Sequence, residues 1–251
     1  MERERQSLTS HLLKLSSKSL YDAATKHEFL TAAGTGTLDH PRLALWLSQD
    51  KIYATQGYPR FIGSLIANMA YNKPHLKGMS EEESYYRVLK TLIFCLENIG
   101  REIDFFTTTA EKWNLDLGGW KDRDATKKYL AEMDKVVKDH GPGIECGLVF
   151  LWAMERVYLD AWTYVKIQLQ SSNPQPDENL TIAATYSFTA NWSNDEFVAF
   201  VERLAEIVDS LDIAPGSPTW KTCEEVWSRV VELEVSTHRS EKEDKEQLFK
   251  K

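Results

Sequence analysis

The sequence contains no long apolar run. No stretch approaches the roughly 20 consecutive apolar residues that a membrane-spanning helix needs. The opening residues, MERERQSL, show neither the apolar segment nor the small-residue cleavage site of a secretory signal peptide. Glu2 and Glu4 also argue against a transit peptide, because such peptides are poor in acidic residues. We therefore expect a cytoplasmic protein that has no membrane partner.

Cysteine and positive charge are both scarce. The three cysteines, Cys95, Cys146 and Cys223, lie far apart with no CxxC spacing, which is typical of reduced thiols and excludes a zinc ribbon. The chain has 30 Lys and Arg residues against 38 Asp and Glu residues, a formal net charge of −8. Binding to a phosphate backbone needs a concentrated cationic face, so nucleic acid is not an expected partner.

The chain is instead rich in apolar and aromatic residues. Hydrophobic residues make up 42% of the 251 positions, and the 8 Trp, 10 Tyr and 10 Phe residues favour a folded globule with a substantial core. There are no internal repeats and no sustained apolar alternation with a period of two residues. We predict an all-α protein with a single helical domain over 1–238, followed by a charged tail, 239–251, that is frayed or disordered.

Capping residues and prolines divide the chain into helices. We predict helices over 7–26, from 42 to a stop or kink near Pro59, from 81 onward, and over 124–138, 144–170, 194–211 and 218–237. Ser80 with Glu83 and Ser193 with Glu196 have the spacing of capping boxes, Asp39 is placed to cap the second helix, and Ser217 precedes a first-turn proline. Only 177–188 is a candidate strand.

Two carboxylates fall on the apolar faces of predicted helices. Asp50 shares a face with Leu43 and Leu47, and Glu234 lies close to an inward stripe that includes Val230. An unpaired buried charge costs several kcal/mol, so each acid is paired, faces a cavity or has a function. Taken alone, each fits a core acid satisfied by a tyrosine, an arginine or a backbone donor. Together, in a chain rich in aromatics, they also fit acid and base chemistry around a planar ligand.

Cys146 opens the helix predicted over 144–170. The positive end of a helix macrodipole favours a thiolate, which makes this residue a candidate nucleophile. The alternative is a buried thiol that only fills space, as free cysteines commonly do. Glu155, nine residues further on, is half a turn out of phase with Cys146, and we expect it to make a structural pair.

Residues 27–53 resemble the signature segment of the TenA, or thiaminase II, family. The matching residues are His27 and Phe29, Gly36-Thr37-Leu38, Gln49-Asp50 and Tyr53. Further along, Cys146 falls where a subgroup of that family has its cysteine nucleophile, the segment NWSNDEF is similar to the family's TYASEEF, and the spacing from Trp227 to Glu234 is the one that places the family's glutamate.

The resemblance implies a heme-oxygenase-like helical bundle, assembled as a homo-oligomer, with a closed pocket for an aminopyrimidine. Its implied activity is hydrolysis of an aminopyrimidine or of thiamin itself in vitamin salvage, without a cofactor or a metal. The implied catalytic residues are Cys146 as nucleophile, Asp50 on the ring's amino edge and Glu234 as proton shuttle. Tyr53, Tyr129, Phe150 and Trp192 are the implied substrate-binding residues.

Three departures from the family pattern keep other functions open. Trp192 and Phe150 stand where the family has tyrosines, and Thr237-His238 replaces a Phe-Trp pair. Each lost hydroxyl removes a hydrogen bond worth roughly 0.5 to 1.5 kcal/mol, so the substrate can differ. One alternative is a binding protein or regulator that keeps the cavity without catalysis. Another is a heme or metal centre with His27 as ligand, although no second ligand follows His27 at metal-binding spacing.

Overall fold

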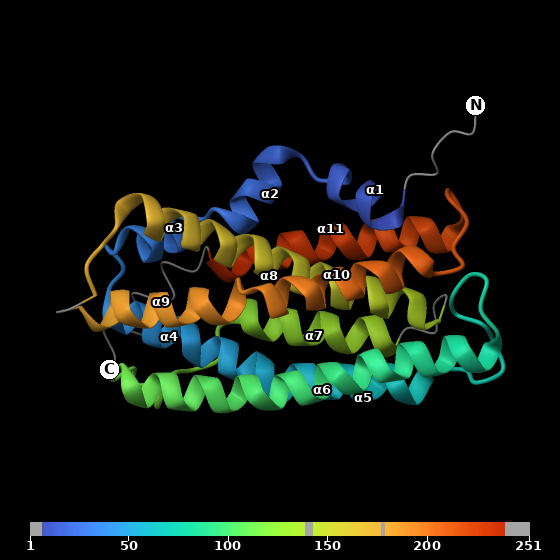
Figure 1. The fold of residues 1–251 in the computed structure, drawn as a ribbon, viewed down its shortest axis with the longest axis horizontal. Coiled ribbons are helices and arrows are strands. Elements are labelled where there is room, and N and C mark those ends of the chain that lie inside the picture. The colour runs from blue at the N-terminus through green and yellow to red at the C-terminus, as the bar shows by residue number, and fades with distance from the viewer. Residues whose placement is uncertain (1–6, 139–142, 177–178, 239–251) are drawn as a thin grey trace.

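The computed structural model describes residues 7–138, 143–176 and 179–238, and within these ranges every regular element is helical. The long helices run roughly along the long axis of the molecule (Figure 1). In chain order the elements are α1 (Leu8–Leu15), α2 (Lys18–Thr25), α3 (Glu28–Thr35), α4 (His40–Ile52), the π-helical turn η1 (Tyr53–Gly57), α5 (Tyr58–Asn68), α6 (Glu81–Lys112), α7 (Asp124–Lys138), α8 (Ile144–Ser172), α9 (Leu180–Trp192), α10 (Asp195–Ser210) and α11 (Pro218–His238). The prediction of an all-α bundle is confirmed. The predicted tail, 239–251, lies outside the described residues.

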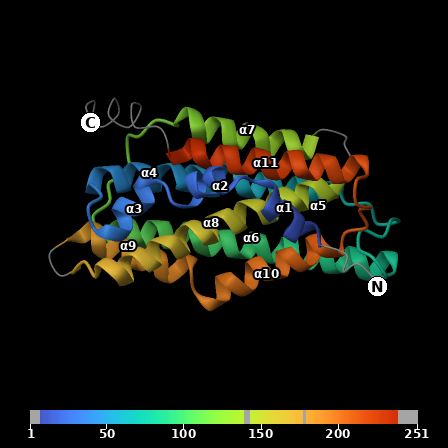
Figure 2. The same cartoon turned by 90° about the horizontal axis from the view of Figure 1, so that it is seen from above.

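Helix α8 forms the centre of the bundle. It packs against α11, α3, α10, α9 and α2, and its first eleven residues are all buried. Such a helix must be apolar on all sides, which is why the segment GLVFLWAM has no polar face. In Figure 2, α7 and α11 lie side by side along one edge of the molecule, while α10 lies on the opposite side of α8. The residues of this first part of α8 therefore face other helices or an internal space.

Several predicted helix boundaries are confirmed. Ser80 and Glu83 form a reciprocal capping box that starts the 32-residue helix α6. The Ser217 side chain accepts a hydrogen bond from the Trp220 backbone at 3.2 Å, at the start of α11. Asp39 is the residue before α4, but its side chain makes no capping hydrogen bond.

Three local predictions are wrong. The helix predicted over 7–26 is two helices, because Ser17 caps α2 and breaks the chain after α1. The candidate strand 177–188 is largely helix α9, whose start is capped by the Asn179 side chain. Asn194, not Ser193, caps α10 by accepting from the Phe197 backbone, while Ser193 donates its hydroxyl to the Thr189 carbonyl. In each case a side chain binds the free backbone N–H groups at the start of a helix and so sets where that helix begins.

Among the described residues, no helix combines the length and the apolar character needed to cross a membrane.

Two glycines in helices give a matched test of this packing. A Cβ atom at Gly34, on α3, would collide with Gln168 Cβ and lie 3.1 Å from the Val165 carbonyl oxygen, both on α8. A Cβ atom at Gly100, in the middle of α6, would meet nothing within 4 Å. We expect Gly34→Ala to destabilise the protein by about 1–3 kcal/mol, since it overpacks the α3–α8 contact. Gly100→Ala should stabilise it by about 0.5–1 kcal/mol through helix propensity. Urea unfolding of both variants measures the two effects, and equal shifts would contradict the close α3–α8 approach.

Candidate functional site

A cavity of about 130 Å³ lies inside the bundle, lined by residues of α4, η1, α6, α7, α8, α9 and α11, among others. Its walls are largely aromatic, and include Trp46, Tyr53, Tyr129, Tyr158 and Trp192. An apolar cavity of about 150 Å³ in another protein holds one benzene molecule, so this space suits a single six-membered ring.

Four carboxyl groups from four helices line the cavity. They are Asp50 of α4, Glu102 of α6, Glu155 of α8 and Glu234 of α11. All four residues are half-buried. Asp50, Glu155 and Glu234 lie deep within the protein, so the surface that they expose faces the cavity. Among the described residues that line the cavity, Arg123 is the one Lys or Arg. The acids therefore outnumber the nearby cations.

Each of three acids accepts a hydrogen bond from a tyrosine. The Tyr158 hydroxyl donates to Asp50 Oδ2 at 2.8 Å, the Tyr58 hydroxyl donates to Glu155 Oε1 at 2.7 Å, and the Tyr129 hydroxyl donates to Glu234 Oε1 at 2.7 Å. These bonds satisfy one carboxyl oxygen of each acid and fix its orientation. The remaining oxygens of Asp50 and Glu155 are groups that a ligand in the cavity can meet.

Burial raises the pKa of all four acids. The pKa of Asp50 is raised to about 8: desolvation is the main cause, the Tyr158 hydrogen bond opposes it, and the neighbouring Glu102, Glu234 and Glu155 add to it. Desolvation likewise raises the pKa values of Glu155 and Glu234 to about 7 each. The pKa of Glu102 is also raised by burial, against hydrogen bonds from Trp192 and Asn191. At neutral pH the cavity thus holds carboxyl groups in both protonation states, as acid and base catalysis requires.

The π-helical turn η1 places Tyr53 and Tyr58 on the same side of the helix, the side that faces the cavity. In a regular α-helix, residues five apart point about 140° away from each other. The wider turn, closed by the hydrogen bond from the Tyr58 backbone to the Tyr53 carbonyl, brings both rings to the cavity with centroids 5.9 Å apart. Such turns are frequent at functional sites. The predicted stop or kink near Pro59 is this π-helical turn, after which the chain continues as helix α5.

Gln49, the neighbour of Asp50, ties the start of α7 to α4. Its Oε1 atom accepts from the Arg123 backbone and from the Thr126 hydroxyl, both at 2.8 Å, and its Nε2 atom donates to the Lys121 carbonyl at 3.1 Å. The Gln-Asp pair of the signature segment therefore has two tasks: Asp50 faces the cavity, and Gln49 fixes the helix that carries Tyr129.

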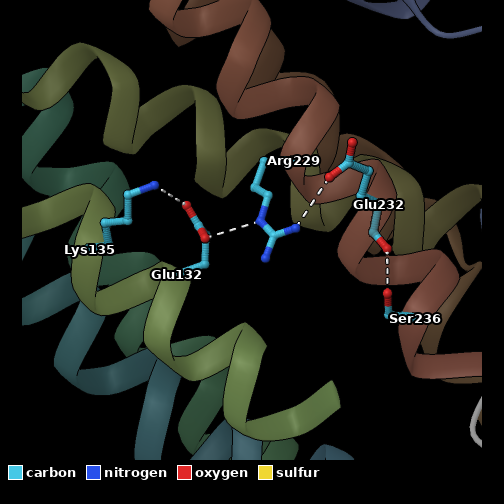
Figure 3. A network of polar contacts seen from close by, with 5 residues as sticks. All are labelled: Glu132, Lys135, Arg229, Glu232 and Ser236. Carbon is cyan, nitrogen blue, oxygen red and sulfur yellow. Dashed lines mark hydrogen bonds and ion pairs between the residues drawn. The ribbon is translucent and has the colours of Figure 1, made fainter. Parts of the chain in front are cut away.

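An ion-pair network also joins α7 to α11 (Figure 3). Arg229 Nε donates to Glu132 Oε2 at 3.1 Å and Arg229 Nη1 donates to Glu232 Oε2 at 3.2 Å, while Lys135 pairs with the other oxygen of Glu132. Glu132 lies three residues from Tyr129, and Arg229 lies five residues from Glu234. The network thus holds together the two helices whose side chains meet in the Tyr129–Glu234 hydrogen bond.

The structure brings most of the predicted site residues to this cavity. Asp50 and Glu234, from opposite ends of the sequence, both line it. Tyr53, Tyr129 and Trp192 line it as well. Trp192 does not offer a hydroxyl to the cavity. Its ring stacks on Phe188, and its indole N–H donates to Glu102.

Cys146 and Phe150 are not among the residues that line the cavity. Cys146 is buried in the first turn of α8, with its Sγ atom 3.9 Å from Cys223 Sγ. The hydrogen bond with Cys223 lowers the pKa of the Cys146 thiol. Nine residues of helix, about 13.5 Å of rise and half a turn of phase, separate it from Glu155. Phe150 is fully buried behind Tyr129 and Phe61. The expected meeting of Cys146 with the two acids is therefore not found.

Glu155, on the same helix as Cys146, does line the cavity. It makes a structural pair, as the sequence predicts, because it accepts the hydrogen bond from Tyr58, and it also faces the cavity. The sequence does contain a pattern that identifies this face: Glu155, Tyr158 and Trp162 are spaced i, i+3 and i+7, and all three line the cavity. No comparable pattern identifies Glu102, because its partner Trp192 lies 90 residues away in the chain.

His27 has a structural role in the described chain. It is the capping residue of α3, where its Nδ1 atom accepts from the Phe29 backbone at 3.2 Å. Among the residues the structure describes, no group of three or more His, Cys, Asp or Glu side chains is arranged to hold a metal ion. Thr237 and His238 complete α11, but their side chains lie outside the described part of the chain.

The sequence matches no protein-family model. It is 27% identical over 261 residues to a Fusarium pseudograminearum protein named "Probable transcription factor", covering 92% of this chain but only 51% of that protein, so this chain spans about half its length. It is 22% identical over 218 residues to a Glycine max protein named "Probable bifunctional TENA-E protein", covering 86% of this chain and 85% of that protein.

Solved structures of TenA homologues share the fold. A TenA homologue from Pyrococcus furiosus superposes with a TM-score of 0.73 at 19% identity, covering 92% of this chain and 98% of the other. A Sulfolobus solfataricus protein described as a "tena-like thiaminase" superposes with a TM-score of 0.63 at 14% identity, covering 92% and 93%. The resemblance to the TenA family and the prediction of its heme-oxygenase-like bundle are therefore confirmed at the level of the fold.

The raised pKa values make stability depend on pH. Asp50, Glu155 and Glu234 keep their protons in the folded protein to about pH 7–8, whereas the unfolded chain loses them near their ordinary values of 3.8 and 4.5. This contribution to stability is complete below those ordinary values and is lost as pH rises through the folded values. We expect the free energy of unfolding to fall by at least about 2 kcal/mol between pH 5 and pH 8.5. Urea unfolding across this range measures it.

Asp50→Asn should reduce that dependence, because asparagine has no proton to lose. Asp104→Asn, which removes an exposed acid from α6, is the matched control and should leave the slope unchanged. Identical slopes for wild type and Asp50→Asn would contradict the assignment of a buried, protonated Asp50.

Proposed function

We propose that this protein hydrolyses the C–N bond of an aminopyrimidine or a thiamin-derived compound, with Asp50 binding the ring and with Glu155 and Glu234 as the reacting carboxyl groups. The observation that carries the proposal is that these three acids, each oriented by a tyrosine, share one ring-sized cavity. The relatives named TENA-E and tena-like thiaminase support the same substrate class.

The cavity matches a weakly basic heteroaromatic ring better than an apolar one. Its aromatic walls provide stacking surface, and Tyr53 and Tyr129 meet edge to face with centroids 5.6 Å apart. A ring that carries an amino group beside a ring nitrogen offers a donor and an acceptor on one edge. A carboxyl group pairs with such an edge through two hydrogen bonds. Asp50, held at one oxygen by Tyr158, is the group we assign to that edge.

The other two acids act on the exocyclic carbon. In its protonated form Glu234 gives a proton to the departing nitrogen, and in its ionised form Glu155 accepts a proton from the attacking water. The C–N bond breaks, a C–O bond forms, and the products are a hydroxymethyl pyrimidine and an amine, with no change in oxidation state. Because both pKa values lie at about 7, both forms are present at neutral pH.

A second candidate function is ligand binding without turnover. The Fusarium relative is named as a transcription factor, although this chain spans only about half of it. The same cavity could hold the same ligand in a regulator, and ligand-induced thermal stabilisation without product would identify that function. The cytoplasmic location and the homo-oligomer stay predictions.

Variants of Glu155 and Cys146 test the proposed reaction most sharply. With an aminomethyl pyrimidine as substrate, we expect Glu155→Gln to lower kcat at least about 100-fold, since general acid and base groups contribute about 10²–10⁴-fold. Cys146→Ala should keep kcat within about threefold of wild type, because this thiol lies outside the cavity and a threefold change is under 1 kcal/mol. Product formation followed by chromatography measures both.

Thermal unfolding of each variant provides the folding control. A fully active Glu155→Gln protein, or a Cys146→Ala protein that folds normally but has lost its activity, would refute the assignment of Glu155 and return Cys146 to the centre of the mechanism.

A further inference from the structure

A second hollow adjoins the cavity and opens at the surface. Four side chains, Asn98, Glu102, Trp192 and Phe197, line both spaces and so form the partition between them. The outer hollow is completed by residues of α6, α9 and α10 and the turn between them, among them the exposed Arg101 and Glu196 at its rim. Of the four acids of the inner cavity, Glu102 alone also faces this outer hollow.

Two consecutive residues at the end of α9 fix Glu102 in the partition. The Asn191 side chain donates to its Oε2 atom at 3.0 Å, and the Trp192 indole N–H donates to its Oε1 atom. A carboxylate offers about four acceptor sites, so these two bonds leave room for further donors. None of the three tyrosines that bind the other acids is bonded to Glu102 in the described contacts. Glu102 therefore serves a different part of the site.

The outer hollow is polar and carries more negative than positive charge. Its lining includes two acids, Glu102 and Glu196, and one cation, Arg101. The Arg101 guanidinium donates to Glu196 at 3.3 Å and to Asn98 Oδ1 at 2.9 Å. The Arg101–Glu196 pair is well exposed to solvent. A small cation with N–H donors suits this charge pattern better than an anion does.

We propose that the outer hollow is the subsite for the leaving group, and that Glu102 is the counter-ion of an aliphatic amine as it departs. The assignment rests on the proposed C–N hydrolysis. The ring occupies the inner cavity, its exocyclic carbon lies at the partition, and the amine faces Glu102. The amine binds in its protonated form. When the C–N bond breaks, the nitrogen keeps the electron pair, takes up the proton of Glu234 and leaves as an ammonium ion into the outer hollow, while Glu155 accepts the proton that the attacking water gives up. Water supplies the new C–O bond.

This arrangement sets the substrate class. A primary amine fits, and so does a secondary amine with a short polar substituent, because the substituent extends into the outer hollow. A neutral alcohol at the same carbon lacks the charge that Glu102 pairs with. The chain should therefore bind the aminomethyl pyrimidine more tightly than its hydroxymethyl counterpart, which also favours release of the product.

Calorimetric binding of three probes at pH 7 tests the charge assignment: the aminomethyl pyrimidine, its N-hydroxyethyl derivative and the hydroxymethyl pyrimidine. Wild type should bind the amine at least about tenfold more tightly than the alcohol, the difference that one charge-assisted hydrogen bond supplies. Glu102→Gln should reduce that ratio to within about threefold of unity. Glu97→Gln, an exposed position on α6 outside both spaces, is the matched control and should keep the wild-type ratio.

Asn98→Phe tests the position of the subsite and covers the case in which Glu102→Gln fails to fold. By narrowing the partition, it should weaken binding of the N-hydroxyethyl derivative at least about tenfold more than binding of the unsubstituted amine, a difference of about 1.4 kcal/mol. The assignment is overturned if folded Glu102→Gln keeps the wild-type ratio, or if Asn98→Phe weakens both amines equally. If wild type binds none of the three probes, both the subsite and the proposed function are wrong. If wild type binds them without turnover, these ratios still decide the subsite.

Discussion

Burying four carboxyl groups around one small space is the constraint on which the rest of this structure depends. Ionised carboxylates so close together repel one another, and burial adds a desolvation cost to each. The protein offsets that cost in two ways. Three of the acids each accept a hydrogen bond from a different tyrosine, and the raised pKa values allow protons to stay bound near neutral pH. The raised pKa values that make the buried acids stable also make the cavity suited to catalysis, because neutral and ionised acids then coexist.

The surrounding architecture can be understood as support for that chamber. The π-helical turn aligns Tyr53 with Tyr58, and Gln49 anchors the start of α7. The Glu132–Arg229 network holds α7 against α11, so that Tyr129 reaches Glu234. These contacts are local, but they join helices that are far apart in the sequence. The position of each reacting group is thus set by a partner on another helix, which is the usual condition for a precisely oriented site.

Much of the fold could be predicted from the sequence, and part of the site as well. Helical periodicity and capping residues identified most of the helices and placed Asp50 and Glu234 on inward faces, because those patterns depend only on neighbours in the chain. Such patterns were not sufficient to place Cys146 relative to the cavity. Its place at a helix start is visible in the sequence, but which face of the central helix α8 meets the cavity is decided by packing on all sides. Glu102 was not identifiable at all, since its role depends on Asn191 and Trp192, which lie 89 and 90 residues further along the chain.

The central claim is that carboxyl groups in this cavity are protonated in the folded protein at neutral pH. Infrared difference spectroscopy detects the carbonyl stretch of a protonated carboxyl group directly, and it distinguishes that group from an ionised one. We predict a protonated-carboxyl band at pH 7 that titrates with an apparent pKa of about 7 to 8 and weakens in Asp50→Asn. A wild-type protein whose carboxyl groups are all ionised above pH 6 would contradict the account.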